Sequence, residues 1–296
     1  MKTKLLKENL IKAALFASAV SSIVIVFFIV SYMAYGGSNI FINWIEHGFT
    51  GPLYNMIPYM FNSVYIALGG TILGVIIGLP CAIYLAEFAD MRIRNIVKPT
   101  IEMLNGFPSV IIGLLGFTLL VKQPLSFGIT PALGIHGEGN MLFGWIVLGI
   151  MALPIITSIS EDSIRAVPQE LREASLGLGA TKWQTTIEIL IPGAMSGVLT
   201  SILLALASGI GETMAVLSVI GIVVPPPLTL NPLMQSNSLT TLIATSVGDA
   251  GNQLSNVRFQ VLLAAGMILF IMTTIIVLLV RVIISQRGKV NVGRPK

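Results

Sequence analysis

The sequence predicts an all-α fold, a polytopic membrane bundle of six transmembrane helices with its N and C termini in the cytoplasm. Composition is the first observation behind this prediction, because 54% of the 296 residues are hydrophobic and 10% are charged. In an ordinary soluble domain about a quarter of the residues are charged. The other two observations are the length of six apolar stretches and the unequal distribution of positive charge among the loops between them.

Six apolar stretches are long enough to cross about 30 Å of hydrocarbon, for which a helix needs roughly 20 residues. They cover residues 13–34, 63–86, 104–121, 141–160, 190–222 and 259–284. We accordingly divide the chain into an N-terminal helix with its outer loop, a core of five transmembrane helices and a basic cytoplasmic tail, at residues 1–60, 61–285 and 286–296.

A short amphipathic segment precedes the third predicted span. Ile93, Ile96 and Ile101 recur there at helical spacing, with basic residues on the opposite side. This pattern predicts a helix that lies at the membrane surface and bends near Pro99.

The loops between the spans differ in charge. When alternate loops are assigned to opposite sides of the membrane, all 17 Lys and Arg residues except Lys122 and Arg258 fall on one side. An excess of Lys and Arg marks the cytoplasmic side, so both termini are predicted to be cytoplasmic. The net charge of +4 is thus explained by orientation in lipid, and we expect no nucleic-acid partner.

The sequence lacks the motifs that several kinds of chemistry require. The chain has one cysteine, Cys81, which excludes a disulfide framework, and it has no phosphate-binding loop of the Gly-x-x-x-x-Gly-Lys-Ser/Thr type. His47 and His136 fall in predicted outer loops without a metalloprotease pattern. We therefore expect no metal site, no cofactor and no enzymatic activity, and any use of ATP must come from another subunit.

Residues 161–188 form a predicted cytoplasmic loop with distinctive helix signals. Val167-Pro168 precedes a short helical pattern, and Gly177 with Gly179 ends it. Thr181-Lys182-Trp183-Gln184 then fits a capping box for the next helix. The sequence therefore predicts a rigid protrusion just outside the membrane.

This loop resembles the EAA loop of ABC importer permeases. Glu173-Ala174-Ser175, Gly179 and Ile189-Leu190-Ile191-Pro192 follow its spacing, with Ser175 for the usual second Ala and Ile191 for the usual Leu. The resemblance implies the type I ABC importer permease fold and a coupling helix that sits in a groove of an ATPase subunit. The residues that it assigns to ATPase docking are Glu173, Ala174, Ser175, Gly179, Leu178 and Arg172.

A second resemblance, over about residues 60–285, is to the phosphate (Pst) branch of these permeases. Gly211-Glu212-Thr213-Met214-Ala215-Val216 carries it, together with Gly106-Phe107-Pro108-Ser109-Val110 and Tyr84-Leu85-Ala86-Glu87. Methionine and valine after the Gly-Glu-Thr core favour the PstC role over PstA. The branch usually has Arg four residues before this Glu, whereas this chain has Ser208.

The resemblance implies a permease subunit of an ATP-driven importer, for inorganic phosphate, that works by alternating access. Its implied partners are a second, PstA-like permease, two PstB-like cytoplasmic ATPase subunits and a PstS-like extracytoplasmic phosphate-binding protein, with membrane lipid around the helices. Permeases for molybdate, tungstate or sulfate remain alternatives. Another is an ion-coupled secondary transporter with Glu212 as the coupling acid.

Glu212 is a lone acid within an apolar run from about residue 189 to 224. A charge at mid-membrane costs about 2.5 kcal/mol or more, so such an acid is a functional candidate. A protonated Glu that only hydrogen-bonds a neighbouring helix is the plainer explanation. Asn105 and Ser109, at the predicted start of the third span, could likewise mark an ordinary helix start. The residues predicted to line a translocation path are Glu212, Ser208, Thr213, Ser109 and Asn105.

Overall fold

The computed structural model describes residues 2–47, 55–121, 139–250 and 256–287, most of which are helical. The predicted basic tail from residue 288 onward, Lys122 and His136 lie outside the described residues. The chain divides into two compact units, residues 1–55 with 245–270 and residues 56–244 with 271–296.

The first unit is built on the long helix α1 (Lys2–His47), and it also contains residues of α11 (Leu239–Ala250) and α12 (Val257–Arg287). Within this unit Asn39 Nδ2 donates a hydrogen bond to Gln260 Oε1 at 3.5 Å. Most apolar side chains of α1 are exposed, including Phe16 and Phe27, as expected for a helix surrounded by lipid.

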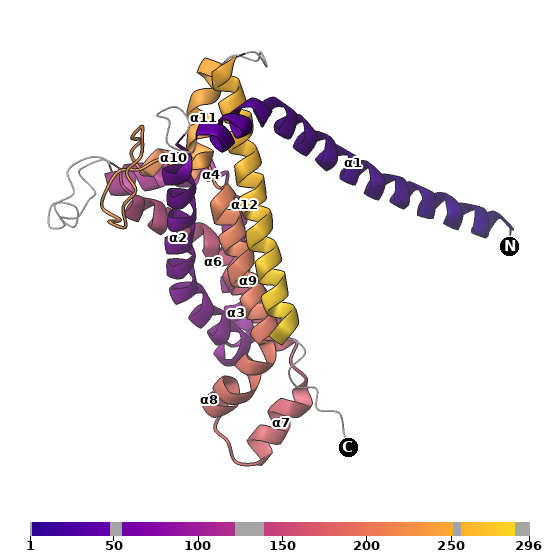
Figure 1. Ribbon diagram of the computed structural model, residues 1–296. Coiled ribbons are helices and arrows are strands. Elements are labelled where there is room, and N and C mark those ends of the chain that lie inside the picture. The colour runs from indigo at the N-terminus through magenta and orange to yellow at the C-terminus, as the bar shows by residue number, and fades with distance from the viewer. Residues whose placement is uncertain (1, 48–54, 122–138, 251–255, 288–296) are drawn as a thin grey trace. The chain divides into compact units, whose positions relative to one another are not determined.

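The second unit contains the remaining helices. They are α2 (Ile57–Ile83), the π-helical turn η1 (Tyr84–Phe88), α3 (Met91–Glu102), the 3₁₀ turn η2 (Met103–Gly106), α4 (Ser109–Gly116), the π-helical turn η3 (Phe117–Val121), α6 (Met141–Arg165), α7 (Gln169–Gly177), α8 (Lys182–Thr185), the π-helical turn η4 (Thr186–Leu190), α9 (Ile191–Gly211) and α10 (Met214–Val219). In Figure 1, α2, α6 and α9 run side by side, and α7 and α8 lie at one end of the unit.

The predicted number of spans is confirmed. Among the described residues, 5 helices are long and apolar enough to cross a membrane, or 6 when the bent pair Met91–Gly106 and Ser109–Val121 is one span. The two arms of this pair meet at 97°. The prediction of a bend near Pro99 is wrong, because α3 continues through Pro99 and the chain turns at Phe107-Pro108. Phe107 is extended (φ −77°, ψ 131°), as a residue before proline prefers.

The fifth predicted span, 190–222, is wrong at its outer end. Helix α9 ends at Gly211, Glu212 is extended (φ −72°, ψ 126°), and α10 starts at Met214. Irregular backbone at membrane depth is tolerated only where protein or a water-filled cavity satisfies its polar groups. The break at Glu212 therefore needs partners from the surrounding helices.

Glycines bring α2 and α6 into close contact. A Cβ atom at Gly70 would lie 2.5 Å from Leu148 Cβ, and one at Gly74 would lie 2.8 Å from Ala152 Cβ. One turn further on, Thr157 Oγ1 donates to the carbonyl oxygen of Gly78 at 3.2 Å. Small residues at this four-residue spacing are the usual means by which membrane helices approach each other.

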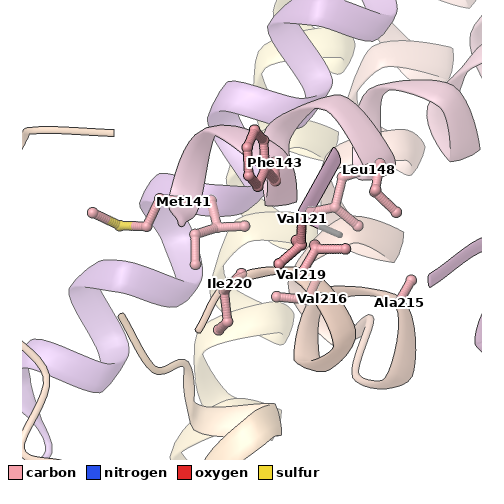
Figure 2. Packing of buried hydrophobic residues seen from close by; sticks show 10 residues of the cluster. Val121, Met141, Phe143, Leu148, Ala215, Val216, Val219 and Ile220 are labelled. Atoms are coloured by element: carbon pink, nitrogen blue, oxygen red, sulfur yellow. The ribbon is translucent and has the colours of Figure 1, made fainter. Parts of the chain in front are cut away.

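A buried apolar cluster holds the short helix α10 in place (Figure 2). Side chains of α10 and the residue after it pack against α4, η3 and α6. The buried members of the cluster are Ile66, Val121, Met141, Phe143, Val147, Leu148, Ala215, Val216, Val219 and Ile220. Because α10 is anchored in this way, the position of Glu212 at its start is also fixed.

The close contact of α2 and α6 gives a stability prediction. Gly74→Leu should lower the stability of the detergent-solubilised protein by about 2–3 kcal/mol, the usual effect of overpacking a tight contact. A Cβ atom at Gly177 would meet nothing within 4 Å, so Gly177→Ala is the matched control. Thermal unfolding measures both variants, and equal melting temperatures would contradict the packing described.

Candidate functional site

A cavity of about 200 Å³ lies between α2, α6, α9 and the η2 turn. Its polar lining consists of Thr71, Asn105, Ser208 and Glu212. The rest of the lining is Ala67, Leu104, Phe107, Leu148, Met151, Ala152, Ile155, Ala205 and Gly209. A water needs about 10–15 Å³ of such space, so the cavity can hold a small hydrated ion.

Glu212 occupies the helix break at the edge of this cavity. Its backbone N–H donates to Gly209 O at 3.3 Å, and its carbonyl oxygen accepts a hydrogen bond from Thr240 Oγ1 at 3.1 Å. The carboxylate atom Oε1 accepts a hydrogen bond from the Ala215 backbone N–H at 3.4 Å. Both backbone polar groups of Glu212 therefore have hydrogen-bond partners, while its carboxylate keeps most of its capacity to accept hydrogen bonds.

The electrostatics of the cavity are unusual for an anion site. Glu212 is the one ionisable group among the described residues that line it, and neither Lys nor Arg is among them. The neutral donors are the Asn105 amide and the hydroxyls of Thr71 and Ser208. A ligand that offers both hydrogens and acceptor oxygens suits this set better than a fully ionised one.

The structure brings together three of the five residues predicted for the path. Asn105, Ser208 and Glu212 line the cavity, although Asn105 is more than 100 residues away from the other two in sequence. Ser109 begins α4 outside the lining, and the Thr213 hydroxyl donates to Gly211 O at 3.3 Å. Thr71, which also lines the cavity, lies in an apolar stretch that gave no local signal of a site.

The loop 161–188 has the local structure that its sequence predicts. Helix α7 begins directly after Pro168, and Gly179 has a φ of 87°, a left-handed value that favours glycine. The capping box is confirmed, because Gln184 N–H donates to Thr181 Oγ1 at 3.2 Å and Thr181 N–H donates to Gln184 Oε1 at 2.8 Å. Protein contacts thus hold the turn between α7 and α8.

The residues predicted for ATPase docking differ in their surroundings. Leu178 is 90% exposed, Glu173 and Ala174 are exposed, and Ser175 shares a hydrogen bond of 2.9 Å with Thr185. Arg172 instead points into the protein, where its Nη2 atom pairs with Glu87 Oε1 at 2.7 Å.

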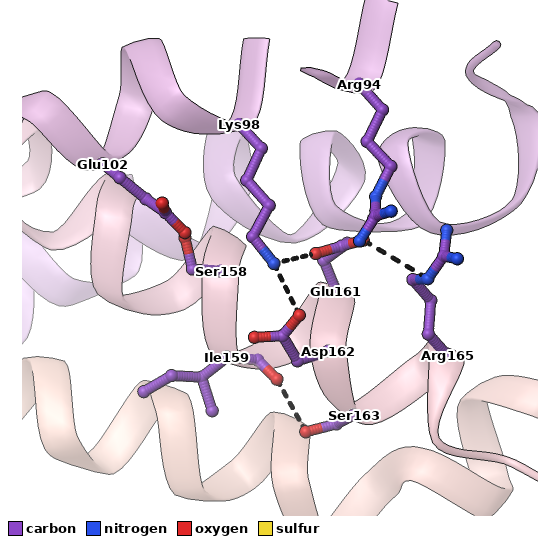
Figure 3. Close-up of polar contacts among 9 residues, drawn as sticks. All are labelled: Arg94, Lys98, Glu102, Ser158, Ile159, Glu161, Asp162, Ser163 and Arg165. Carbon is purple, nitrogen blue, oxygen red and sulfur yellow. Dashed lines mark hydrogen bonds and ion pairs between the residues drawn. The ribbon is translucent and has the colours of Figure 1, made fainter. Parts of the chain in front are cut away.

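Helix α3 is fixed to the end of α6 by a row of polar contacts (Figure 3). Arg94 Nε and Lys98 Nζ lie 2.7 Å and 2.5 Å from the two oxygens of Glu161, whose side chain is fully buried. Lys98 also pairs with Asp162 at 2.5 Å. The basic side of α3 therefore faces α6. Its apolar residues Ile93, Ile96 and Met103 are exposed, which agrees with an amphipathic helix at the membrane surface.

The contacts continue one turn further along α3, where Ser158 Oγ donates to Glu102 Oε1 at 2.9 Å. Residues 94, 98 and 102 are each four apart, so one side of α3 meets α6 along its length. The η2 turn follows at once and carries Asn105 into the cavity. The row of contacts thus positions a cavity residue. The spacing of Arg94 and Lys98 could have indicated that one side of α3 makes polar contacts, but it could not have identified their partner at residue 161.

Comparison with known proteins identifies the family. Residues 70–288 match the family model described as "Binding-protein-dependent transport system inner membrane component". The chain belongs to this family. It is a permease subunit of an ABC importer, a transport subunit located in the membrane.

Two relatives show the extent of the similarity. A protein of Bacillus subtilis named "Probable ABC transporter permease protein YqgH" is 35% identical over 237 residues, which are 80% of this chain and 74% of the relative. The phosphate transport system permease protein PstC of Haemophilus influenzae is 30% identical over 231 residues, 72% of this chain and 70% of the relative.

The fold agrees with solved structures of other importers. A chain of the MetNI methionine ABC transporter, in an inward facing conformation, superposes with a TM-score of 0.57 at 18% identity and covers 76% of this chain and 93% of its own length. The predicted fold class is therefore confirmed, and the permease has the type I ABC importer architecture.

The buried carboxylate at the end of α6 gives the second prediction. Glu161→Gln removes the buried carboxylate from Arg94 and leaves Lys98 with Asp162 as its remaining partner. Removal of one member of a buried ion pair costs on the order of 3 kcal/mol. The purified variant should unfold at a distinctly lower temperature. Asp162→Asn is the matched control, because the Asp162 side chain is 65% exposed and such pairs contribute about 1 kcal/mol at most. Equal decreases in the unfolding temperature of the two variants would contradict the central position of Glu161.

Proposed function

We propose that this permease carries inorganic phosphate and that Glu212 contacts the anion on its path. The observation that carries the proposal is the position of Glu212 at a helix break on the edge of a cavity whose other polar groups are neutral. Broken membrane helices are a recurrent way of building a substrate site. The relatives named as phosphate transport permeases support the choice of substrate.

A carboxylate suits phosphate better than other oxyanions. Near neutral pH inorganic phosphate keeps one or two acidic hydrogens, whereas sulfate keeps none. Glu212 can accept those hydrogens, and charge-assisted hydrogen bonds are roughly twice as strong as neutral ones. A fully ionised anion meets only repulsion from the same group, so Glu212 discriminates against it.

The neutral donors would hold the other oxygens of the anion. Ser208 lies in the last turn of α9, four residues before Glu212, and lines the same cavity, as do Thr71 and Asn105. The resemblance places Arg where Ser208 stands, so the positive charge expected there is absent from the described cavity lining. In this proposal a hydroxyl takes its place, and the hydrogens on phosphate reduce the need for a cation.

The energy for transport would enter through the loop 161–188. Its tip exposes Leu176, Leu178 and Trp183, apolar side chains that suit a groove on a partner protein. The helical span from Lys182 to Gly211 connects this loop to Ser208 and ends one residue before Glu212. Closure of two PstB-like ATPases would displace the loop and tilt this span, which gives alternating access.

The complex would also contain a PstA-like second permease and a PstS-like extracytoplasmic phosphate-binding protein. The chain itself would take the PstC role. Hydrolysis of ATP would belong to the ATPase subunits, since the sequence lacks the phosphate-binding loop.

The test measures uptake of phosphate by the complex reconstituted in liposomes, with ATP supplied on the side of the membrane where the ATPase subunits lie. Glu212→Gln should lower phosphate uptake by about tenfold, because a hydrogen bond to a charged group contributes about 1.5–3 kcal/mol. Molybdate, tungstate and sulfate should compete weakly with phosphate in the unmutated complex, and more effectively in the variant.

Glu8→Gln is the matched control, because Glu8 is an exposed acid of α1 that does not line the cavity. Unchanged phosphate uptake by an assembled Glu212→Gln complex would refute the role of the carboxylate. Uptake of another oxyanion in preference to phosphate would refute the proposed substrate.

A further inference from the structure

The loop α7–α8 is attached to the end of α2 on both of its flanks. On the α7 side, Arg172 Nη2 pairs with Glu87 Oε1 at 2.7 Å. On the α8 side, Lys182 Nζ lies 5.2 Å from the centre of the Phe88 ring, and the ring centres of Phe88 and Trp183 are 6.2 Å apart. Two consecutive residues of η1 therefore hold the loop.

The ion pair is the stronger of these attachments. The Glu87 side chain is 4% exposed and that of Arg172 is 22% exposed. Arg172 Nη1 also donates to Gln169 Oε1 at 3.1 Å, and its Nε atom is buried with no hydrogen-bond partner among the described residues. Loss of either partner leaves the other charge largely buried and uncompensated, so each of the two side chains depends on the other in this arrangement.

The η1 turn continues α2 without interruption, and the two form one helical span from Ile57 to Phe88. This span supplies Ala67 and Thr71 to the cavity wall. At 1.5 Å per residue, Thr71 lies roughly 24 Å along the helix from Glu87. Glu87 and the α2 side of the cavity wall therefore belong to one continuous helical span.

The loop is joined to the opposite wall of the cavity by the chain itself. The span Lys182–Gly211 leads to Ser208, so movement of α8 moves this wall directly. The chain provides no such direct continuity between the loop and the wall formed by α2, since the loop and η1 are about 80 residues apart. Apolar packing of Leu79, Ile83 and Ala86 joins α2 and η1 to α9. The pair Arg172–Glu87, separated by 85 residues, adds a polar connection from η1 to the loop itself.

We propose that the Arg172–Glu87 ion pair is a transmission link that makes α2 follow the loop α7–α8 when the ATPase subunits move it. The inference rests on the proposed function. Both are positioning residues that do not contact substrate. Without the link, α2 keeps its apolar packing on α9 but follows the loop less closely, so ATP hydrolysis continues while the cavity changes access less efficiently.

The experiment measures ATP hydrolysis and substrate uptake in the same proteoliposomes, with the complete complex. In Glu87→Gln the ATPase should still co-purify, and the ATP hydrolysed per anion transported should rise ~5-fold or more, the low end of usual coupling effects between linked sites. Asp90→Asn is the matched control, because Asp90 is an exposed acid three residues away whose side chain makes no capping hydrogen bond. Its ratio should stay at the unmutated value.

The double variant Glu87→Gln with Arg172→Gln guards against loss of folding, because it removes the ion pair without leaving a buried charge. It should be uncoupled to a similar degree. An unchanged ratio in either assembled variant would overturn the link. The ratio is measured with whichever oxyanion the unmutated complex takes up, so failure of phosphate as substrate would contradict the proposed function and not the link.

Discussion

The break between α9 and α10 is the constraint on which the rest of the second unit depends. Polar backbone groups cannot be left unpaired at membrane depth, so a helix that stops there must be surrounded by partners. Thr240 supplies one of them to the Glu212 carbonyl oxygen, and the buried cluster around α10 holds the far side of the break. The close contact of α2 with α6 forms the opposite wall, which leaves a cavity where the helix ends.

Three acids differ in whether basic residues of the chain neutralise them. Glu161 is fully buried against Arg94 and Lys98, and Glu87 is nearly buried against Arg172. Each is neutralised within the chain and fixes one helix to another. Glu212 has one long hydrogen bond from a backbone N–H and borders open space. Its carboxylate is therefore the one of the three that is free to bind something else, which is why we place the substrate there.

Local signals in the sequence predicted the spans, the capping box at Thr181 and the bend at Gly179, since each depends on residues a few positions apart. The break at Glu212 was not predicted because Gly209 and Gly211 in an apolar run do not by themselves stop a membrane helix, and distant contacts such as the one from Thr240 help to stabilise the break. The inward orientation of the Arg94 and Arg172 side chains could not be predicted for the same reason, because their partners are 67 and 85 residues away. Resemblance identified the family and singled out Glu212 as a candidate, but it did not indicate the cavity.

The most direct test of the claim that substrate passes through the cavity beside Glu212 uses a single cysteine. Cys81 is the sole cysteine of the chain, so Cys81→Ala with Ser208→Cys places one thiol in the cavity lining. We expect a small water-soluble thiol reagent to modify this residue in the assembled complex and phosphate to slow the modification. Sulfate at the same ionic strength should protect much less. Modification at the same rate with and without phosphate, in a complex that still transports it, would contradict the account.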